Sequence, residues 1–121
     1  MAWQSGLQPS LIPWFEWILS FMTYFDPTVR VSSAYRSPTE QARLYRRYLA
    51  GLMPGPVAPP GRSLHEQGRA VDFWSPSWEQ DFDASDPPDV LVRAGEAWEA
   101  VGGTWGGHFR TVAADPIHFE A

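Results

Sequence analysis

The chain begins with an apolar segment that predicts a buried helix. Eleven of the 15 residues from 11 to 25 are hydrophobic. Ser10 is placed to cap this helix, and Pro13 fits its first turn. Pro27 ends it, because the residue before a proline is disfavoured in helical conformation. We therefore expect a core helix over about residues 10–25.

The same segment is the candidate for a membrane span or a secretory signal. It is shorter than the about 20 apolar residues that cross a bilayer, and it contains Glu16. No Lys or Arg precedes Arg30, so the positively charged start of a signal peptide is missing. We expect no membrane span and a protein that starts in the cytoplasm.

Downstream of this helix the pattern changes to a strand and then to a second helix. Apolar and polar residues alternate over residues 29–34, which is typical of a short strand. Ser37 can cap the helix that follows, Pro38 fits its first position, and Glu40 stands where a capping box has its acid. We expect this helix to end at Gly51.

The rest of the chain is divided by segments rich in Pro and Gly. Strand-like alternation and helical periodicity are confined to the stretches between them. The predicted elements are a loop over residues 53–62, a strand over 69–74, a loop over 75–89, a helix over about 90–101 and a last strand around 117–119. No repeat or linker interrupts this order. The sequence therefore predicts one α+β domain over residues 1–121.

The composition excludes several kinds of chemistry. The chain has no cysteine, which rules out disulfides, thiol nucleophiles and thiolate zinc sites. All nine basic residues are Arg, and 14 acidic residues bring the net charge to −5, the opposite sign from most duplex-DNA binders. We expect no nucleic-acid partner. A transition-metal site would have to combine the three histidines with carboxylates.

A cluster of acids in the second half raises the alternative of a calcium site. Five acidic residues fall within residues 79–89. Their spacing lacks the Asp-x-Asp-x-Asp-Gly order and the distal Glu of an EF-hand loop. We interpret this segment as a solvated acidic loop.

Two histidines stand where they can share an ion with a carboxylate. His65 precedes Asp72 by seven residues, and Gly68 between them allows a sharp turn. His118 falls in the last predicted strand. A His, Asp, His set leaves one coordination position open, as catalytic zinc sites do. From spacing alone, the alternative is that each histidine is an ordinary, partly buried side chain.

Three motifs occur in a fixed order along the chain. They are Ala-Tyr-Arg-Ser-Pro at residues 34–38 with Gln41 behind it, Ser-x-His-x-x-Gly-x-Ala-x-Asp at 63–72, and Asp-Pro-Ile-His-Phe-Glu at 115–120. Together they resemble the M15 family of zinc peptidases, and the resemblance extends from Val29 to Glu120. It implies a small hedgehog/DD-peptidase-like domain, with an antiparallel sheet flanked by about three helices. The catalytic part would occupy about residues 29–120.

The resemblance also implies roles for individual residues. His65, Asp72 and His118 match the positions that bind one zinc ion. Asp115 matches the general base, and Arg36 matches the basic side chain that stabilises the developing oxyanion. Without the resemblance, Arg36 would be interpreted as a solvent-facing side chain at the end of a strand, and Asp115 as the start of a turn.

Further residues near these motifs have less specific roles. Ser63 and Gln41 match positions near the substrate. In a regular strand Asp115 and His118 would face opposite sides, so we expect Asp115 to lie in an irregular turn. Glu120 would share a face with His118, where it orients a ligand or belongs to the surface.

The function implied by the resemblance is cleavage of peptidoglycan stem peptides by a monomer. The Trp-Gly-Gly at residues 105–107 and the Asp-x-x-His motif resemble the phage endolysin branch, which implies an L-Ala–D-Glu endopeptidase released from the cytoplasm to the cell wall. The alternatives are a D-Ala-D-Ala carboxypeptidase and a non-catalytic, zinc-bearing wall-binding module. The third histidine, His108, is interpreted as a bystander.

Overall fold

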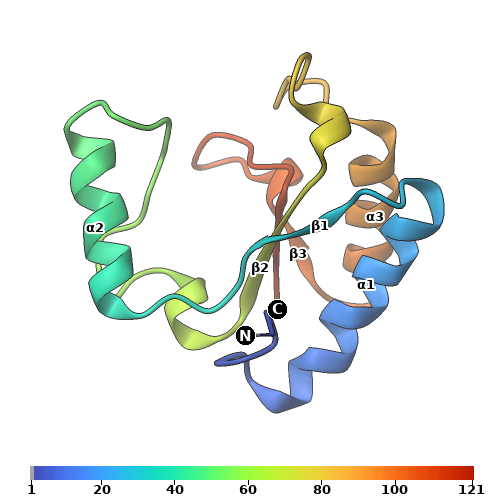
Figure 1. Cartoon of the computed structure of the whole chain (residues 1–121), viewed down its shortest axis with the longest axis horizontal. Coiled ribbons are helices and arrows are strands. Elements are labelled where there is room, and N and C mark those ends of the chain that lie inside the picture. Colours follow the sequence, from blue (N-terminus) through green and yellow to red (C-terminus); the bar gives the residue numbers. More distant parts are fainter. Residues whose placement is uncertain (1) are drawn as a thin grey trace.

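Three helices and one four-stranded sheet form the framework of the protein (Figure 1). The structure is a computed structural model and describes residues 2–121. The helices are α1 (Ile12–Phe25), α2 (Pro38–Leu49) and α3 (Asp89–Ala100), and the strands are β1 (Arg30–Ser33), β2 (Ala70–Trp74), β3 (Thr104–Trp105) and β4 (His118–Glu120). The predicted α+β class, with an antiparallel sheet and about three helices, is confirmed.

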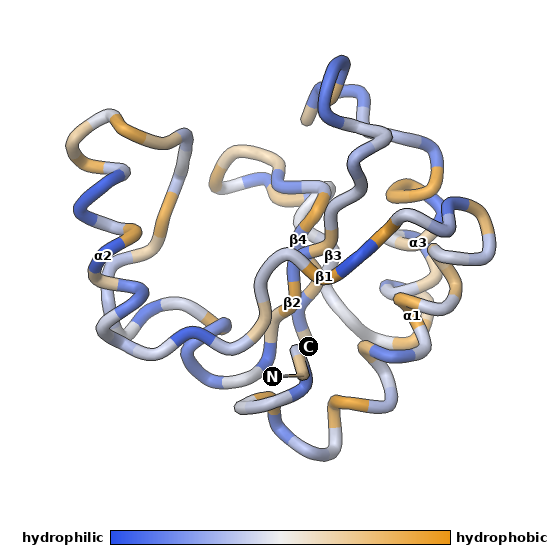
Figure 2. Tube along the Cα trace, viewed as in Figure 1, coloured by the Kyte–Doolittle hydropathy of each residue, from blue (hydrophilic) through white to orange (hydrophobic). Residues whose placement is uncertain are grey.

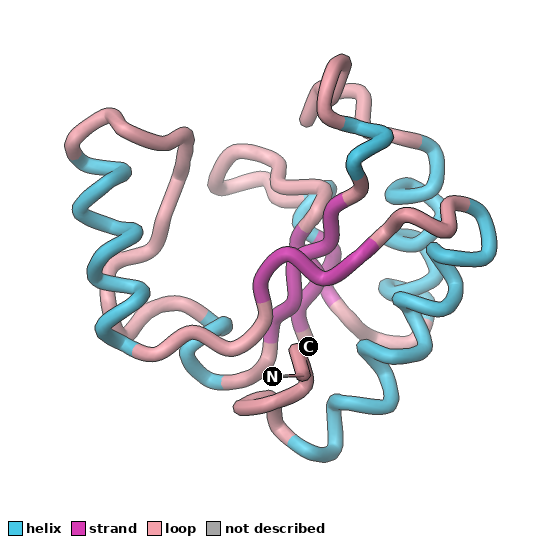
Figure 3. The backbone as a smooth tube through the Cα atoms, in the orientation of Figure 1, coloured by secondary structure: helices cyan, strands magenta, loops and turns pink. Residues whose placement is uncertain are grey.

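The sheet is built around β2 and β4, which lie between the edge strands. The strand order is β1-β2-β4-β3, and every neighbouring pair is antiparallel. The strands lie together in the middle of the molecule (Figure 3). Four of the five residues of β2 are buried, so this strand is covered on both faces. Its register against β4 pairs Asp72 with His118, which lie far apart in the sequence.

Helices α1 and α3 pack together on one side of the sheet and supply the core (Figure 1). Phe15 of α1 stacks on Trp98 of α3 with ring centroids 5.2 Å apart, and Trp98 meets Phe119 of β4 edge-on at 6.2 Å. The indole Nε1–H of Trp98 donates to the Glu120 carbonyl at 2.8 Å, so its polar atom is satisfied inside the core. The apolar run therefore forms the predicted helix, but only one face of it is buried, because Trp14, Trp17, Tyr24 and Phe25 are exposed. Within residues 2–121, no helix has both the length and the apolar character needed to cross a bilayer.

The start of α1 differs from the prediction. Ser10 is not its cap, because the chain enters the helix through a 3-10 turn, Pro9–Leu11, that includes this residue. The residue before the helix is Leu11, which makes no side-chain cap, and Pro13 lies in the first turn as expected. The 3-10 turn supplies backbone hydrogen bonds of its own, so no serine cap is formed.

Helix α2 lies on the opposite side of the molecule from α1 and α3 (Figure 1). Ser37 caps it as predicted, accepting a hydrogen bond from the Glu40 N–H. The Glu40 carboxylate does not complete a capping box but pairs with Arg43 at 2.7 Å. A full capping box forms instead between Ser63 and Glu66, at the short 3-10 helix that carries His65.

Gly68 ends that 3-10 helix and turns the chain into β2. Its φ of +68° lies in the left-handed region that side chains disfavour. A Cβ at this position would lie 2.6 Å from the Gly6 carbonyl oxygen and 2.9 Å from the Gln8 nitrogen. The expected sharp turn between His65 and Asp72 is therefore present, and the N-terminal segment packs against it.

Replacing Gly68 with Ala is expected to destabilise the fold through both backbone strain and this close contact. Gly51→Ala is the matched control, because Gly51 has a φ of +73° but nothing lies within 4 Å of its missing Cβ. We expect Gly51→Ala to lower the free energy of unfolding by about 1 kcal/mol, and Gly68→Ala to lower it by about 1–3 kcal/mol more. Urea unfolding measures both, and equal losses would contradict the proposed packing constraint.

Candidate metal centre

Three ionisable side chains from separate motifs converge at one end of the β2–β4 pair. His65 comes from the 3-10 helix Leu64–Gln67, Asp72 from β2 and His118 from β4. Each offers one ligand atom, and these atoms all lie within 4.8 Å of one another. Among residues 2–121 this is the one group of three or more such side chains with metal-binding spacing. The acidic segment over residues 79–89 contributes none of its members.

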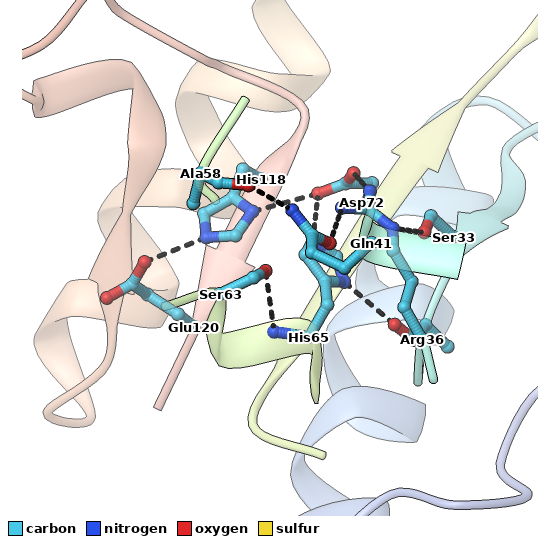
Figure 4. Close-up of polar contacts among 10 residues, drawn as sticks. Ser33, Arg36, Gln41, Ala58, Ser63, His65, Asp72, His118 and Glu120 are labelled. Carbon is cyan, nitrogen blue, oxygen red and sulfur yellow. Dashed lines mark hydrogen bonds and ion pairs between the residues drawn. The ribbon is translucent and has the colours of Figure 1, made fainter. Parts of the chain in front are cut away.

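The Asp72 carboxylate occupies the middle of the group (Figure 4). Its Oδ1 lies 2.9 Å from His118 Nδ1 and 3.3 Å from His65 Nε2. In a tetrahedral zinc site with bonds of about 2.0 Å, neighbouring ligand atoms are about 3.3 Å apart. The donor types, and the spacing of Asp72 from each histidine, therefore fit a zinc ion.

Hydrogen bonds behind both histidines set which nitrogen faces the centre. His65 Nδ1 lies 2.7 Å from the Ala34 carbonyl oxygen, so this nitrogen carries the proton and donates it. In the neutral, metal-binding form of the ring the lone pair is then on Nε2, which faces Asp72. His118 is turned the other way round, with Nδ1 toward Asp72 and Nε2 2.8 Å from Glu120 Oε1.

The carboxylate of Asp72 and the ring of His118 each stabilise the charged form of the other. Burial opposes ionisation of Asp72, but hydrogen bonds from His118 and His65 outweigh it and hold the pKa of this carboxyl well below its usual range. Burial likewise opposes the charged form of His118, yet Asp72 and then Glu120 raise the pKa of His118 to about 9. The surroundings therefore stabilise positive charge at this point, which is what a cation site requires.

Arg36 lies against the same carboxylate and is held rigidly. Its guanidinium donates to Ser33 Oγ at 3.0 Å, to Gln41 Oε1 at 3.2 Å and to Asp72 Oδ2 at 3.3 Å. A guanidinium has five N–H donors and three are used here, so two remain. The side chain is 18% exposed, which excludes the interpretation as a solvent-facing arginine.

Gln41 and Ser63 lie in the wall of the site, but their polar groups already have partners. Gln41 is the buried residue of α2; besides accepting from Arg36, it donates from Nε2 to the Ala58 carbonyl at 2.8 Å. Ser63 Oγ accepts the His65 backbone N–H at 3.2 Å. Both therefore hold other parts of the site in place.

Asp115 lies outside β4, in the irregular turn that the sequence predicts. Its carbonyl accepts the His118 N–H at 3.0 Å, and its N–H donates to the Gly106 carbonyl at 2.9 Å. A Cβ at position 106 would overlap the Asp115 carbonyl oxygen, which explains a glycine there. Burial, followed by the charge of Asp72, raises the pKa of the Asp115 carboxyl.

These residues open into a cleft of about 660 Å³ between two loops. One loop follows α2 and includes Met53 and Val57; the other precedes β4 and includes Phe109 and Val112. Both loops carry apolar stretches (Figure 2). The cleft therefore combines apolar walls with a charged floor made by the residues described above.

Some features of the site have no clear signal in the sequence. The Ala34 carbonyl that orients His65 and the Ala58 carbonyl that anchors Gln41 are backbone groups from distant loops. The third histidine lies elsewhere: His108 Nδ1 is 2.7 Å from Glu99 Oε1 and its ring packs on Trp105. It does not contribute to the three-residue cluster.

Comparison with solved structures identifies proteins that share this fold. The vancomycin-resistance D,D-dipeptidase VanXYg has a TM-score of 0.68 and 20% identity, over 94% of this chain and 49% of that one. A VanY D,D-pentapeptidase variant in complex with Zn(II) has a TM-score of 0.64 and 20% identity, over 94% of this chain and 71% of that one. The chain thus spans about half the length of VanXYg.

A third solved structure is more similar in sequence. The Serratia marcescens L-Ala D-Glu endopeptidase ChiX is 26% identical, with a TM-score of 0.60, over 98% of this chain and 82% of that one. No curated protein sequence gives a match. A family model of the M15 peptidases, described as D-alanyl-D-alanine carboxypeptidase, matches residues 57–121. Because this match covers more than half of the 121 residues, the chain belongs to the M15 family of peptidases.

Proposed function

We propose that this protein is a zinc-dependent peptidase that hydrolyses a peptide bond in peptidoglycan stem peptides. The observation that carries the proposal is the convergence of His65, Asp72 and His118 beside Asp115 and Arg36 in one cleft. Membership of the M15 family and the peptidase activities named for the similar structures support the same conclusion.

We propose that His65 Nε2, Asp72 and His118 Nδ1 bind the zinc ion. A bound zinc ion would lower the pKa of a water molecule and polarise the scissile carbonyl. The VanY structure in complex with Zn(II) supports the choice of metal. The other residues of the cleft then have to move a proton and stabilise charge.

Asp115 is the proposed general base. Its carboxylate shares the cleft with the three ligands, and its raised pKa makes it a better proton acceptor than an ordinary aspartate. It would take the proton of the attacking water and pass it to the leaving amine. This role also argues against a non-catalytic wall-binding module, which would have no use for a base at this position.

Arg36 is the proposed oxyanion donor. Its two unused N–H groups can donate to the carbonyl oxygen as negative charge develops there. Gln41 holds the guanidinium in place, so it would affect substrate binding through Arg36. Ser63 lines the cleft beside His65 and would contact the peptide only at its edge.

The proposed bond is L-Ala–D-Glu, in the manner of an endolysin that acts as a monomer once it is released to the cell wall. The similarity to ChiX, which extends over most of both chains, favours this bond. A D-Ala-D-Ala carboxypeptidase is the second candidate, favoured by the description of the matching family model. The two activities release different products from the same substrate.

Digestion of purified muropeptides distinguishes the two candidates. We expect mass spectrometry to detect a free stem peptide that starts at D-Glu, together with a muramic acid product that retains L-Ala. Loss of one terminal D-Ala from pentapeptide stems would support the carboxypeptidase instead. If zinc-loaded protein releases neither product, the proposed function is wrong.

Replacing Asp115 with Asn is expected to remove the base but leave the metal ligands intact. Loss of general base catalysis should lower kcat by about 100-fold or more. Zinc content, measured by atomic absorption, should stay at that of the wild type. Asp86→Asn is the matched control, because Asp86 is exposed in the loop before α3 and should retain full activity. An active Asp115→Asn enzyme would exclude this residue as the base.

A further inference from the structure

We propose that Glu120 is a positioning residue for the metal centre: its carboxylate accepts the Nε2–H of His118 and so directs Nδ1 of that ring to the ion. The inference rests on the proposed function. It adds a residue outside the proposed ligand set that acts through His118.

The geometry of the pair is that of a charge-assisted hydrogen bond. Glu120 Oε1 lies 2.8 Å from His118 Nε2, and the two residues share a face of β4 because they are two positions apart (Figure 4). The Glu120 side chain is 22% exposed and that of His118 is 11% exposed, so little water competes for the bond. One neutral imidazole has one N–H, and a carboxylate can only accept. In the neutral ring, which is the form that binds a metal ion, the bond to Glu120 therefore leaves the lone pair on Nδ1.

The backbone of Glu120 is fixed from three directions. It pairs with Ala70 of β2 on one side and with Thr104 of β3 on the other. Its carbonyl accepts the indole N–H of Trp98. The Glu120 side chain is therefore attached to a backbone that the sheet holds in place. Its carboxylate orients the His118 ring before any ion binds.

The two histidines of the centre are supported differently. His65 donates Nδ1–H to a neutral carbonyl, that of Ala34, and presents Nε2. His118 donates Nε2–H to a carboxylate and presents Nδ1. A carboxylate partner makes an imidazole a stronger ligand than a carbonyl partner does, and partners of this kind typically change metal affinity by about 10–100-fold.

The test measures zinc affinity of the metal-depleted protein by competition with a chromophoric chelator. We expect Glu120→Ala to weaken zinc binding by about 10–100-fold. Glu120→Gln should show a smaller loss, because its amide oxygen can still accept the N–H but carries no charge. Thermal unfolding of the metal-depleted variants checks that they fold. If Glu120→Ala does not fold, the zinc affinity of Glu120→Gln tests the proposal.

Glu99→Ala is the matched control. Glu99 pairs with His108 at 2.7 Å, so it is also a carboxylate bound to a histidine, but that histidine lies outside the proposed ligand set. Its removal should leave zinc affinity unchanged. If folded Glu120 variants bind zinc as tightly as the wild type, the positioning role is overturned and the proposed function stands. If the wild type itself binds no zinc, the proposed function fails as well.

The tautomer of His118 gives a second readout that a purely structural role would not predict. In the zinc-loaded wild type, long-range ¹H–¹⁵N correlation spectra should show His118 protonated at Nε2 and coordinated through Nδ1. His65 should show the opposite pattern. Coordination of His118 through Nε2 would overturn the proposal.

Discussion

The antiparallel pairing of β2 with β4 is the constraint on which the rest of the site depends. It places Asp72 directly opposite His118, 46 residues later in the chain. Burial on both faces of β2 fixes this register, because a slip by one residue would turn the Asp72 carboxylate to the face where Val71 and Phe73 pack in the apolar core. The turn at Gly68 then places His65 beside the Asp72 carboxylate. One pair of strands thus assembles the proposed metal ligands.

The elements that depend on local pattern could be predicted from the sequence. The apolar run predicts α1 because each turn of that helix has a hydrophobic side chain that packs in the core. The alternation of side chains along a strand predicts that Asp115 lies outside the strand that contains His118, since the two would otherwise face opposite sides. The Ser10 cap was wrong because a 3-10 turn, whose stability is set by the packing of the N-terminal segment, replaces it. Local pattern also placed Glu120 beside His118, leaving open whether the two side chains meet.

What the sequence could not provide are the backbone acceptors and the loop contacts. No sequence signal marks the carbonyl of Ala34, because every residue has a backbone carbonyl. The fold determines which carbonyl faces His65. Gln41 illustrates the same limit: its motif position suggests contact with substrate, whereas its amide is used by Arg36 and by the Ala58 carbonyl. Motifs identify side chains that meet, and tertiary packing determines what each one does there.

A catalytic metal ion held by His65, Asp72 and His118, as proposed, can be observed directly. The most direct measurement is anomalous diffraction at the zinc edge from crystals of the zinc-loaded protein. We expect one strong anomalous peak, with His65 Nε2, His118 Nδ1 and an Asp72 oxygen each about 2.0–2.2 Å away and a fourth position open to solvent. A peak at another place, such as the acidic loop over residues 79–89, or no peak at this centre, would contradict the proposal.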